Sequence, residues 1–378
     1  MTPLARRLRD RIQADGPVTV ADFMATALGD PEHGYYMHRD PLGRAGDFTT
    51  APEIGQVFGE MIGLWAAAAW QAMGAPDPVR LVELGPGRGT LMADALRAAR
   101  ALPAFADAVR VHLVETSPAL RASQKAALAA HDPTWHGTFA ELPEGPAIIL
   151  ANEFFDALPV HQYERHGADW RERLVGLAEG GEALCFVTGP VVDPGAIAAI
   201  PAPSGAVLES CPAGRALAGD IGARIARAGG VALIVDYGPD RRAPGESLQA
   251  VRDHAARGPL AEPGEADLTA HVDFQTLAGA ARAAGAGVQG PVPQGAWLRR
   301  IGIETRAGVL LRKANARQAK DILAALHRLT APDQMGALFK TMAITAPDLP
   351  PLAGFEPDAE TDAETAPETV QNADPRPA

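Results

Sequence analysis

The stretch Arg80–Leu91, RLVELGPGRGTL, decides the fold class. It opens with an apolar run typical of a strand, and Gly85, Gly87 and Gly89 follow before an Ala- and Leu-rich helical segment begins. Glycine lets the backbone turn tightly and approach a ligand closely. The turn also places the N-terminus of a helix beside the end of a strand, where free N–H groups favour anionic groups.

The spacing of these glycines distinguishes between two kinds of ligand. A dinucleotide-binding loop has the pattern G-x-G-x-x-G, in which the third glycine lies five residues after the first. Here Gly89 lies four residues after Gly85, and Glu83 precedes Gly85 by two. The form E-x-G-x-G-x-G is seen in Rossmann-like methyltransferases that bind S-adenosylmethionine (SAM). The motif therefore predicts that Glu83, Gly85, Gly87 and Gly89 bind SAM; the alternative is a plain strand–helix turn.

A second acidic residue, Glu115, ends the next predicted strand in VHLVETS, residues 111–117. Ligands of open α/β sheets bind outside the carboxyl ends of the strands, where a carboxylate can accept hydrogen bonds from both ribose hydroxyls. The alternative is that Glu115 stabilises the N-terminus of the helix predicted to begin at Pro118. We expect the ribose role.

Strand-like and helical segments alternate along the body of the chain. The predicted strands are 79–83, 109–114, 147–150 and 231–235, and the predicted helices are 52–74, 90–101, 118–130 and 213–228. This alternation is the signature of a parallel sheet covered by helices. The predicted fold is α/β, with a Rossmann-like sheet of the class I methyltransferase type flanked by helices.

Two stretches interrupt the alternation. Residues 160–190 have the pattern of two or three short antiparallel strands, whereas residues 240–272 are rich in Pro, Gly and His and are not obviously regular. A long irregular connection inside a compact domain is usually functional or disordered. We expect a methyltransferase domain over 76–345, with a smaller α+β region inserted at about 157–215 and 240–300.

The negative charge is concentrated at the C-terminus. The chain has a formal net charge of −12, and residues 356–378 hold seven acidic residues and one Arg, a net of −6. This segment has four Pro and no aromatic residue, so it cannot bury enough apolar area to offset ordering and is predicted to be a disordered acidic tail. The rest of the chain is mildly acidic, and nothing in it neutralises phosphates over a broad face, so no nucleic-acid partner is expected.

Composition limits the compartment and the partners further. Cys185 and Cys211 are too few for a disulfide framework or a zinc site and indicate reduced thiols. No apolar run approaches the roughly 18 residues of a membrane span, so no membrane insertion is expected, and no motif has metal-ligand spacing. The basic start of the chain carries Asp10, unfavourable in a presequence, and no cleavage site is evident. We expect a cytoplasmic protein if the source is bacterial and the mitochondrial matrix if it is eukaryotic.

Polar side chains follow the predicted strand 147–150. Asn152, Glu153 and Asp156 lie at its carboxyl edge, where an unpaired amide and two unpaired acids would be costly to bury. We expect them to line the active site. The alternative is a helix-capping turn with the two neighbouring phenylalanines in the core.

A second polar segment, RAGDFTTAPEIGQVFGE (44–60), precedes the glycine loop. Thr50 or Thr49 can cap the helix that follows, with Glu53 as the capping-box partner. The functional alternative is a loop that closes over SAM, with Thr50 beside the cofactor and Asp47 or Glu53 presenting a carboxylate. Residues 1–75 would then be a helical and loop segment that completes the active site.

Further acidic residues occur later in the chain. Asp236 follows the predicted strand 231–235, and Asp267 lies in GEADLTAHVDF. A hydrogen-bonded structural role is expected for each, because a buried carboxylate must be paired.

Taken together and in order, these blocks resemble the MidA-type family, also called DUF185, over roughly residues 5–345. This family includes the mitochondrial complex I assembly-factor methyltransferase and bacterial relatives. The matching blocks are RAGDFTTAPEIGQVFGE, LVELGPGRGT, HLVETS, NEFFDALPVHQY, VDYG, PGEADLTAHVDF and QGAWLRRIGI. The combination is far more specific than the glycine loop.

The resemblance implies a SAM-dependent methyltransferase with an inserted second region, in which Glu83, Gly85, Gly87, Gly89 and Glu115 match the SAM-binding pattern. For the mitochondrial member it implies protein-arginine N-methylation of the 49-kDa-type subunit of NADH dehydrogenase, and hence a protein substrate. A bacterial relative can have another substrate.

Arginine is a difficult methyl acceptor because its guanidinium stays protonated and its nitrogen lone pairs are delocalised. Carboxylates can clamp the guanidinium in a bidentate fork, localise its charge and accept a proton as the new bond forms. Glu153, Asp156 and Asp47 are the catalytic candidates. Three other functions stay open: a SAM-binding assembly factor without activity, a small-molecule methyltransferase and a nicotinamide-dependent oxidoreductase.

Overall fold

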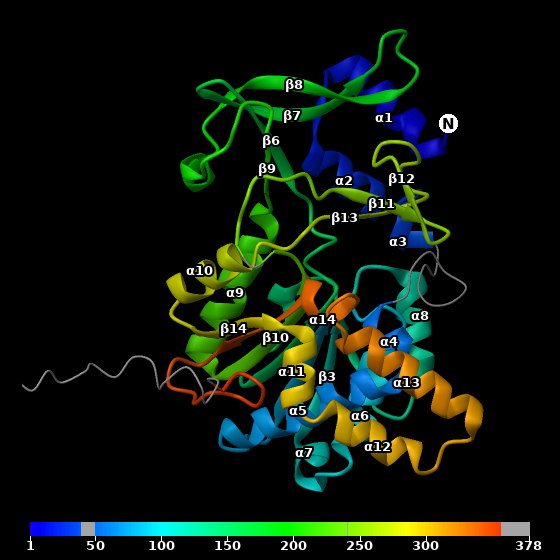
Figure 1. Cartoon of the computed structure of the whole chain (residues 1–378), viewed down its shortest axis with the longest axis vertical. Coiled ribbons are helices and arrows are strands. Elements are labelled where there is room, and N and C mark those ends of the chain that lie inside the picture. The colour runs from blue at the N-terminus through cyan, green and yellow to red at the C-terminus, as the bar shows by residue number, and fades with distance from the viewer. Residues whose placement is uncertain (39–49, 240, 357–378) are drawn as a thin grey trace, which may run out of the picture.

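The computed structural model describes residues 1–38, 50–239 and 241–356. It has two lobes, with a large sheet and most helices in the lower lobe and two smaller sheets in the upper lobe (Figure 1). Asp47 and the acidic tail from residue 357 onward lie outside the described residues.

The large sheet has seven strands in the order β14-β15-β10-β5-β2-β3-β4. Their bounds are β2 Val79–Leu84, β3 Val109–Val114, β4 Thr134–His136, β5 Ala147–Asn152, β10 Gly230–Tyr237, β14 Gly287–Pro293 and β15 Phe339–Thr345. Strands β2, β3, β4, β5 and β10 are parallel, and β15 runs antiparallel to both β10 and β14. The predicted Rossmann-like sheet is confirmed. Its strand order reverses between β2 and β5, where ligands of such sheets bind.

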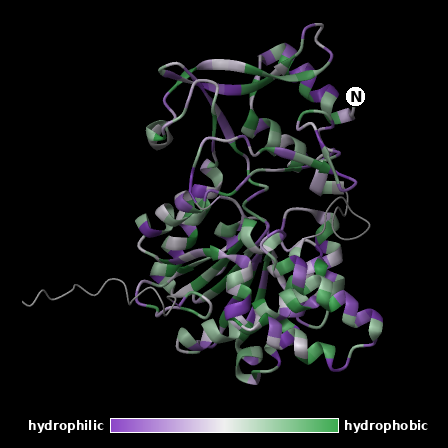
Figure 2. Cartoon of the chain, in the orientation of Figure 1, coloured by the Kyte–Doolittle hydropathy of each residue, from purple (hydrophilic) through white to green (hydrophobic). Residues whose placement is uncertain are grey.

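Both faces of this sheet are buried, because side chains alternate from face to face along each strand. Leu81 and Ile148 pack with α5 and α6, whereas the next residues along the chain, Val82 and Ile149, pack with α9 and α10. Every residue of β10 is buried. Figure 2 shows hydrophobic residues along these strands.

The helices have the following bounds: α1 Pro3–Asp15, α2 Val20–Gly29, α3 Tyr35–His38, α4 Ala51–Ile54, α5 Gln56–Ala72, α6 Thr90–Ala99, α7 Pro103–Ala108, α8 Pro118–Ala127, α9 Pro212–Ala228, α10 Phe274–Ala283, α11 Gln294–Arg300, α12 Ile303–Leu311, α13 Ala316–Thr330 and α14 Met335–Leu338. The single helix predicted over 52–74 is two, because Gly55 is extended with φ 176° and separates α4 from α5. Among the described residues, no helix is both long and apolar enough to cross a membrane.

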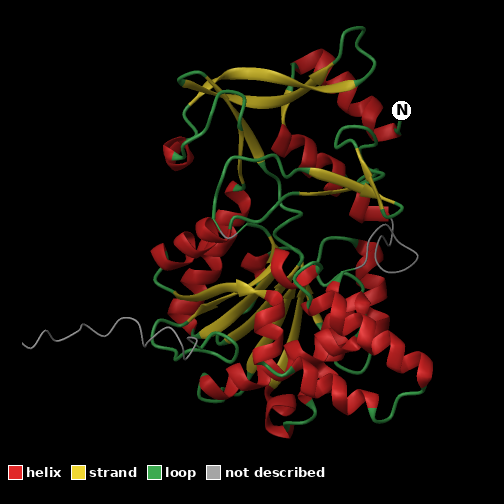
Figure 3. Ribbon diagram, in the orientation of Figure 1, coloured by secondary structure: helices red, strands yellow, loops and turns green. Residues whose placement is uncertain are grey.

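The upper lobe contains an antiparallel sheet of five strands, in which β1 pairs with β7, β7 with β6 and β8, and β6 with β9. The bounds are β1 Val18–Thr19, β6 His161–His166, β7 Asp169–Leu177, β8 Leu184–Val192 and β9 Val207–Ser210. The antiparallel strands predicted within 160–190 are confirmed, and the smaller α+β region is visible in Figure 3. Its core includes Leu4, Phe23 and Val175, so α1 and α2 belong to this lobe.

The stretch 240–300 contributes to both lobes. Strands β11 (Gln249–Arg252), β12 (Ala255–Arg257) and β13 (Asp267–Thr269) form a small antiparallel sheet in the upper lobe. Helix α10 instead packs on the large sheet, and β14 is one of its strands. The connection that looked irregular in the sequence therefore brings Asp267 from the upper lobe to the carboxyl edge of the large sheet.

Candidate active site

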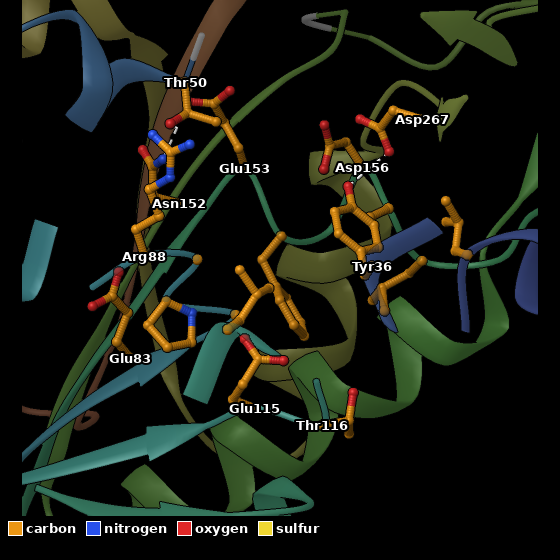
Figure 4. A pocket seen from close by; sticks show the side chains of 18 of the residues that line it. Tyr36, Thr50, Glu83, Arg88, Glu115, Thr116, Asn152, Glu153, Asp156 and Asp267 are labelled. Atoms are coloured by element: carbon orange, nitrogen blue, oxygen red, sulfur yellow. Dashed lines mark hydrogen bonds between the residues drawn. The ribbon is translucent and has the colours of Figure 1, made fainter. Parts of the chain in front are cut away.

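A cavity of about 380 Å³ opens where the strand order reverses, at the carboxyl ends of β2, β3 and β5. Both lobes line it (Figure 4). Of the residues predicted from the sequence, it brings together Thr50, Glu83, Gly85, Gly87, Glu115, Asn152, Glu153 and Asp156. The position agrees with the general rule that ligands bind at the switch point of an open α/β sheet.

The glycine loop joins β2 to α6 and needs its glycines for two reasons. Gly85 and Gly87 have φ of 60° and 53°, in the left-handed region that side chains disfavour. A Cβ on Gly85 would also lie 2.7 Å from Phe154 Cδ2. Gly89 does not line the cavity; with φ 83° it is the N-cap of α6 and packs against Gln124.

Glu83 is 3% exposed and faces the cavity from the end of β2. The pKa of its carboxyl is raised from 4.5 to about 8, mainly by burial and also by the nearby charge of Glu115, whereas a hydrogen bond from the Met92 N–H opposes the shift. Glu83 Oε2 is buried without a hydrogen-bond partner in the described part of the chain, and so is Asn152 Oδ1. Two acceptor atoms are thus available to a ligand with donor groups.

Glu115 lines the cavity at the end of β3, and its carboxylate is held in place from the side of α8. Oε1 accepts a hydrogen bond from the Ser117 N–H at 2.8 Å, and Oε2 accepts one from Gln124 Nε2 at 3.1 Å. Because a carboxylate oxygen has two lone pairs, both oxygens can still accept from a ligand. The two expected roles, helix-end contact and ligand acceptor, are therefore compatible.

Gln124 is a site residue that sequence reasoning did not identify. It is fully buried on α8 and donates from Nε2 to the Gly87 carbonyl at 2.8 Å and to Glu115. Its Oε1 accepts from Trp135 Nε1 at 2.9 Å. One amide thereby fixes the glycine loop relative to the carboxylate at the end of the neighbouring strand. A glutamine on the apolar face of a predicted helix was the available signal.

Glu153 follows β5 with φ 48°, in the left-handed region that is rare for a non-glycine residue. Its Oε1 accepts from the Ala51 N–H at 2.7 Å and from Asn152 Nδ2 at 3.2 Å. Burial raises the pKa of this carboxyl to about 7, whereas these two hydrogen bonds and Arg328 lower it. Glu153 therefore supplies both a polar wall of the cavity and the N-terminal contact of α4.

The predicted capping box at α4 is absent. Thr50 is the N-cap residue, but its side chain makes no capping hydrogen bond and lines the cavity instead. Glu53 accepts from Thr90 Oγ1 at 2.6 Å and lies 3.6 Å from Arg88 Nη1. Glu153, from a distant part of the chain, accepts the N–H of Ala51 at the start of α4. Glu53 instead connects α4 to Arg88 of the glycine loop and to Thr90 of α6.

Asp156 is 6% exposed and lines the cavity. Burial raises the pKa of its carboxyl well above the ordinary value, and the charges of Asp236, Asp267 and Glu153 add to the shift, opposed by a hydrogen bond from Tyr237. Asp236 has the structural role expected from the sequence. It is fully buried, and its Oδ2 accepts from the N–H groups of Phe154, Phe155 and Asp156 at 3.2, 2.9 and 3.3 Å.

Asp267 has more than the structural role expected for it. It lies on β13 in the upper lobe, lines the cavity, and accepts a hydrogen bond from the Tyr36 hydroxyl at 2.7 Å. Asp156, Asp267 and Tyr36 lie together on one side of the cavity in Figure 4. Tyr36 was not identified from the sequence, because 231 residues separate it from Asp267.

These groups fit SAM. The unpartnered acceptors Glu83 Oε2 and Asn152 Oδ1 suit the ammonium group of its methionine part, and Glu115 suits its ribose hydroxyls. Gly85 and Gly87 line the cavity, and without side chains their backbone can approach a ligand closely. When bound, SAM supplies an electrophilic methyl group on a sulfonium.

The mostly parallel sheet, the glycine loop at its switch point and the acid-lined cavity define a SAM-dependent methyltransferase of the Rossmann-like class. The chain belongs to the family described as "Putative S-adenosyl-L-methionine-dependent methyltransferase", whose model matches residues 61–292. This confirms the resemblance to the MidA-type family and SAM as the cofactor.

Curated relatives cover almost the whole chain. The mouse (Mus musculus) protein arginine methyltransferase NDUFAF7, mitochondrial, is 37% identical over 370 residues, which cover 91% of this chain and 84% of the relative. The human (Homo sapiens) protein of the same name is 36% identical, with coverage of 91% and 83%.

Solved structures from Burkholderia thailandensis show the same fold. A likely methyl transferase of the COG1565 superfamily, bound to S-adenosyl-homocysteine, is 28% identical with a TM-score of 0.80. An uncharacterized protein of that superfamily is 29% identical with a TM-score of 0.77. Each alignment covers 94% of this chain and 92% of the other.

Replacement of Glu83 by Gln should change how stability depends on pH. The folded-state pKa is raised from 4.5 to about 8, so the folded state retains a proton that the unfolded state has lost between these values. The free energy of unfolding therefore falls as pH rises through this window. We expect the ligand-free Glu83→Gln variant to lose less thermal stability than the wild type between about pH 5 and about pH 9. Calorimetry measures the melting temperature of each protein at both pH values, with Glu179→Gln, at an exposed position, as the control. Equal losses of thermal stability in the wild type and in Glu83→Gln would contradict the prediction.

Replacement of Gln124 by Met should weaken SAM binding. The substitution keeps the length of the side chain but removes the hydrogen bonds to the glycine loop and Glu115. We expect the Kd for SAM to rise about tenfold, equivalent to about 1.4 kcal/mol, measured by isothermal titration calorimetry. Gln294→Met is the matched control, since Gln294 is also fully buried but donates to the Leu329 carbonyl, which is not part of the glycine loop. A similar loss of affinity in both variants would assign the effect to general destabilisation.

Proposed function

We propose that the protein is a protein-arginine N-methyltransferase. The observation that carries this proposal is the wall of carboxyl groups that continues the SAM site, formed by the half-buried Glu153 and the buried Asp156 and Asp267. Several acids gathered on one wall of a cavity favour a cationic ligand. The guanidinium of arginine matches them in charge and in its planar array of donors. The names of the curated relatives support the same acceptor.

In this proposal Asp156 and Glu153 hold the acceptor and Asp156 receives its proton. Positioning supplies much of the rate of a methyl transfer, because the acceptor nitrogen must lie in line with the methyl carbon. The Glu153 carboxylate is held by the Ala51 N–H, and the backbone of Asp156 is held by the Asp236 carboxylate, which favours a preorganised site. Asp47 remains a third candidate for the same role, although it lies outside the described residues.

We propose that the protein substrate is the 49-kDa-type subunit of NADH dehydrogenase and that its methylation supports assembly of the complex. The support is the resemblance to the complex I assembly-factor methyltransferase. The mitochondrial names of the relatives favour the matrix if the source is eukaryotic; a bacterial protein would act in the cytoplasm.

The direct test is transfer of labelled methyl from SAM by the purified full-length protein into an extract of cells that lack it, followed by mass spectrometry. Label on an arginine of the NADH dehydrogenase subunit is expected. Label on an arginine of another protein would keep the activity and overturn the substrate. Label in small molecules would favour a small-molecule methyltransferase. SAM binding without any label would favour a non-catalytic assembly factor.

Replacement of Glu153 by Gln should leave SAM affinity nearly unchanged and lower turnover about a hundredfold. The amide oxygen can still accept from the Ala51 N–H, so the variant removes the charge and keeps the cap. Single-turnover rates and SAM titrations measure the two effects separately. Glu141→Gln is the control, because Glu141 also accepts a backbone N–H, from Gly137, but lies exposed outside the cavity. Turnover equal to that of the wild type would remove Glu153 from catalysis.

A further inference from the structure

Helices α12 and α13 carry a local excess of positive charge. Residues 299–328 contain eight basic and two acidic residues, a net of +6, whereas the whole chain has a net charge of −12. The two helices pack against each other in the lower lobe, and α13 lies beside α4 (Figure 1). Basic residues are therefore gathered on one part of an acidic protein.

Four of these cations lack a counter-charge. All four are exposed, and none forms an ion pair within residues 1–38, 50–239 and 241–356: Arg312, Lys313, Arg317 and Lys320. We call them the basic face. Other basic residues of the same stretch are paired. Arg299 Nε lies 3.3 Å from Glu304 Oε1, and Arg306 Nε lies 2.8 Å from Oε2 of the buried Glu60.

Like charges repel one another on the basic face. Arg312 and Lys313 are adjacent at the end of α12, and Arg317 and Lys320 are three residues apart on α13, which makes them neighbours on the helix surface. Asp321 is the acid nearest in the chain, and it leaves a net of +3 over residues 312–321. An anionic partner would offset this repulsion.

An apolar groove of about 290 Å³ adjoins the basic face, because Lys313 is one of the residues that line it. Its apolar walls come from α4, α5, α12 and α13, and include Ile54, Val57, Leu310 and Ile322. A segment bound to the basic face can therefore place small apolar side chains beside its charged ones.

The described chain ends close to these helices. The Gly354 carbonyl accepts a hydrogen bond from Arg300 Nη1 at 3.3 Å, and a Cβ on Gly354 would lie 2.9 Å from Ile301 Cγ2. Ile301 precedes α12 by two residues, and the nine residues of α12 span about 14 Å. The 22 residues after Glu356 span about 70 Å when extended and about 25 Å as a flexible chain. They are long enough to reach the basic face.

We propose that the acidic tail (357–378) of this chain docks on the basic face and shields it from other anions. The tail contains six acidic residues and one Arg, so its charge is opposite to that of the face. A flexible tether holds it at an effective concentration of about a millimolar, so individually weak ion pairs suffice. The inference does not depend on the proposed arginine methylation.

Charge, more than burial, must hold the tail in place. Its single large aliphatic residue is Val370, and it has no aromatic residue. Contacts between exposed charges are screened by salt, with a Debye length of about 10 Å at 0.1 M and about 3 Å at 1 M. Docking should therefore be strong at low salt and lost at high salt.

Carbodiimide cross-linking of the full-length protein tests the contact, because this reagent joins an amine to a carboxylate only where the two touch. Of the four lysines in the chain, the basic face has two, Lys125 is exposed on α8 and Lys340 is buried. At low salt, mass spectrometry should find tail carboxylates joined to the lysines of the basic face about tenfold more often than to Lys125, since a tethered tail without attraction would reach both. The excess should disappear at 1 M NaCl, where the Debye length is about 3 Å.

A variant of the face, Arg312→Gln with Arg317→Gln, removes two charges and keeps both lysines. Cross-links of the tail to these lysines should fall to the level of the control lysine. Arg11→Gln with Arg282→Gln is the matched control, because both arginines are exposed, on α1 and α10. Equal cross-linking of all exposed lysines, or no effect of the face variant, would overturn the docking. In a mixture of ¹⁵N-labelled and unlabelled protein, cross-links mainly between two copies would overturn the intramolecular contact and assign the face to a second copy.

Vesicles that contain phosphatidylserine test the shielding. A tail variant carries three changes, Glu360→Gln, Glu364→Gln and Glu368→Gln. It should bind the vesicles about tenfold more tightly than the wild type at low salt, because basic residues near an anionic surface each contribute about 1 kcal/mol. Addition of the two changes of the face variant should abolish this gain. The control has the same change in net charge at exposed positions of other elements: Glu179→Gln, Glu182→Gln and Asp107→Asn.

Two outcomes of the vesicle experiment would contradict the proposal. A gain no larger than that of the control, or one that survives in the combined variant, would overturn the shielding. Tight binding of the wild type through the basic face, without cross-links to the tail, would assign the face to a lipid surface instead.

Discussion

The Asp236 carboxylate, at the end of β10, holds the active-site loop in place. It accepts the N–H groups of three successive residues, Phe154, Phe155 and Asp156, directly after β5. Glu153 precedes them in the left-handed region, which costs about 1 kcal/mol or more for a non-glycine residue. The backbone can hold this turn because the carboxylate compensates it with several charge-assisted hydrogen bonds. These hydrogen bonds direct the Asp156 side chain to the cavity wall and position Phe154 against Gly85 of the glycine loop.

The loop held by Asp236 also connects the large sheet of the lower lobe to the upper lobe. Asp156 O accepts the N–H of Ala270, which directly follows β13, and the Tyr237 side chain reaches Thr269 on that strand. Tyr36 and Asp267 then bring an aromatic hydroxyl and a further acid from the upper lobe to the cavity. The inserted region is therefore part of the site, which the large sheet alone would leave open on one side.

Sequence reasoning found cavity-lining residues where their position follows from local backbone geometry. Glu83, Gly85 and Glu115 could be identified because a strand, a tight turn and a helix leave a pattern of neighbours in the chain. Sequence reasoning missed contacts whose hydrogen-bond partners are far apart in the chain. Glu153 caps α4 across 102 residues, Tyr36 meets Asp267 across 231, and the amide of Gln124 reaches Gly87 across 37. A sequence carries no pairing information at such separations, so Glu53 was assigned to a capping box that Glu153 replaces. For the same reason Asp267 was expected to be structural.

The electrostatics of the cavity impose an order on the reaction. Burial raises the pKa of Glu83 to about 8 and that of Glu153 to about 7, and it raises the pKa of Asp156 as well. In the absence of cations, these carboxyls tend to hold protons, whereas a bound sulfonium and a guanidinium would favour their ionised forms. In the proposed arginine methylation, methyl transfer would remove the sulfonium charge and add a proton to the acid that receives it, so the cavity would lose the attraction that holds the cofactor. Loss of that proton to solvent restores the negative charge that binds the next pair of cations. Product release and proton release are thus two consequences of burying several carboxyl groups around one cavity.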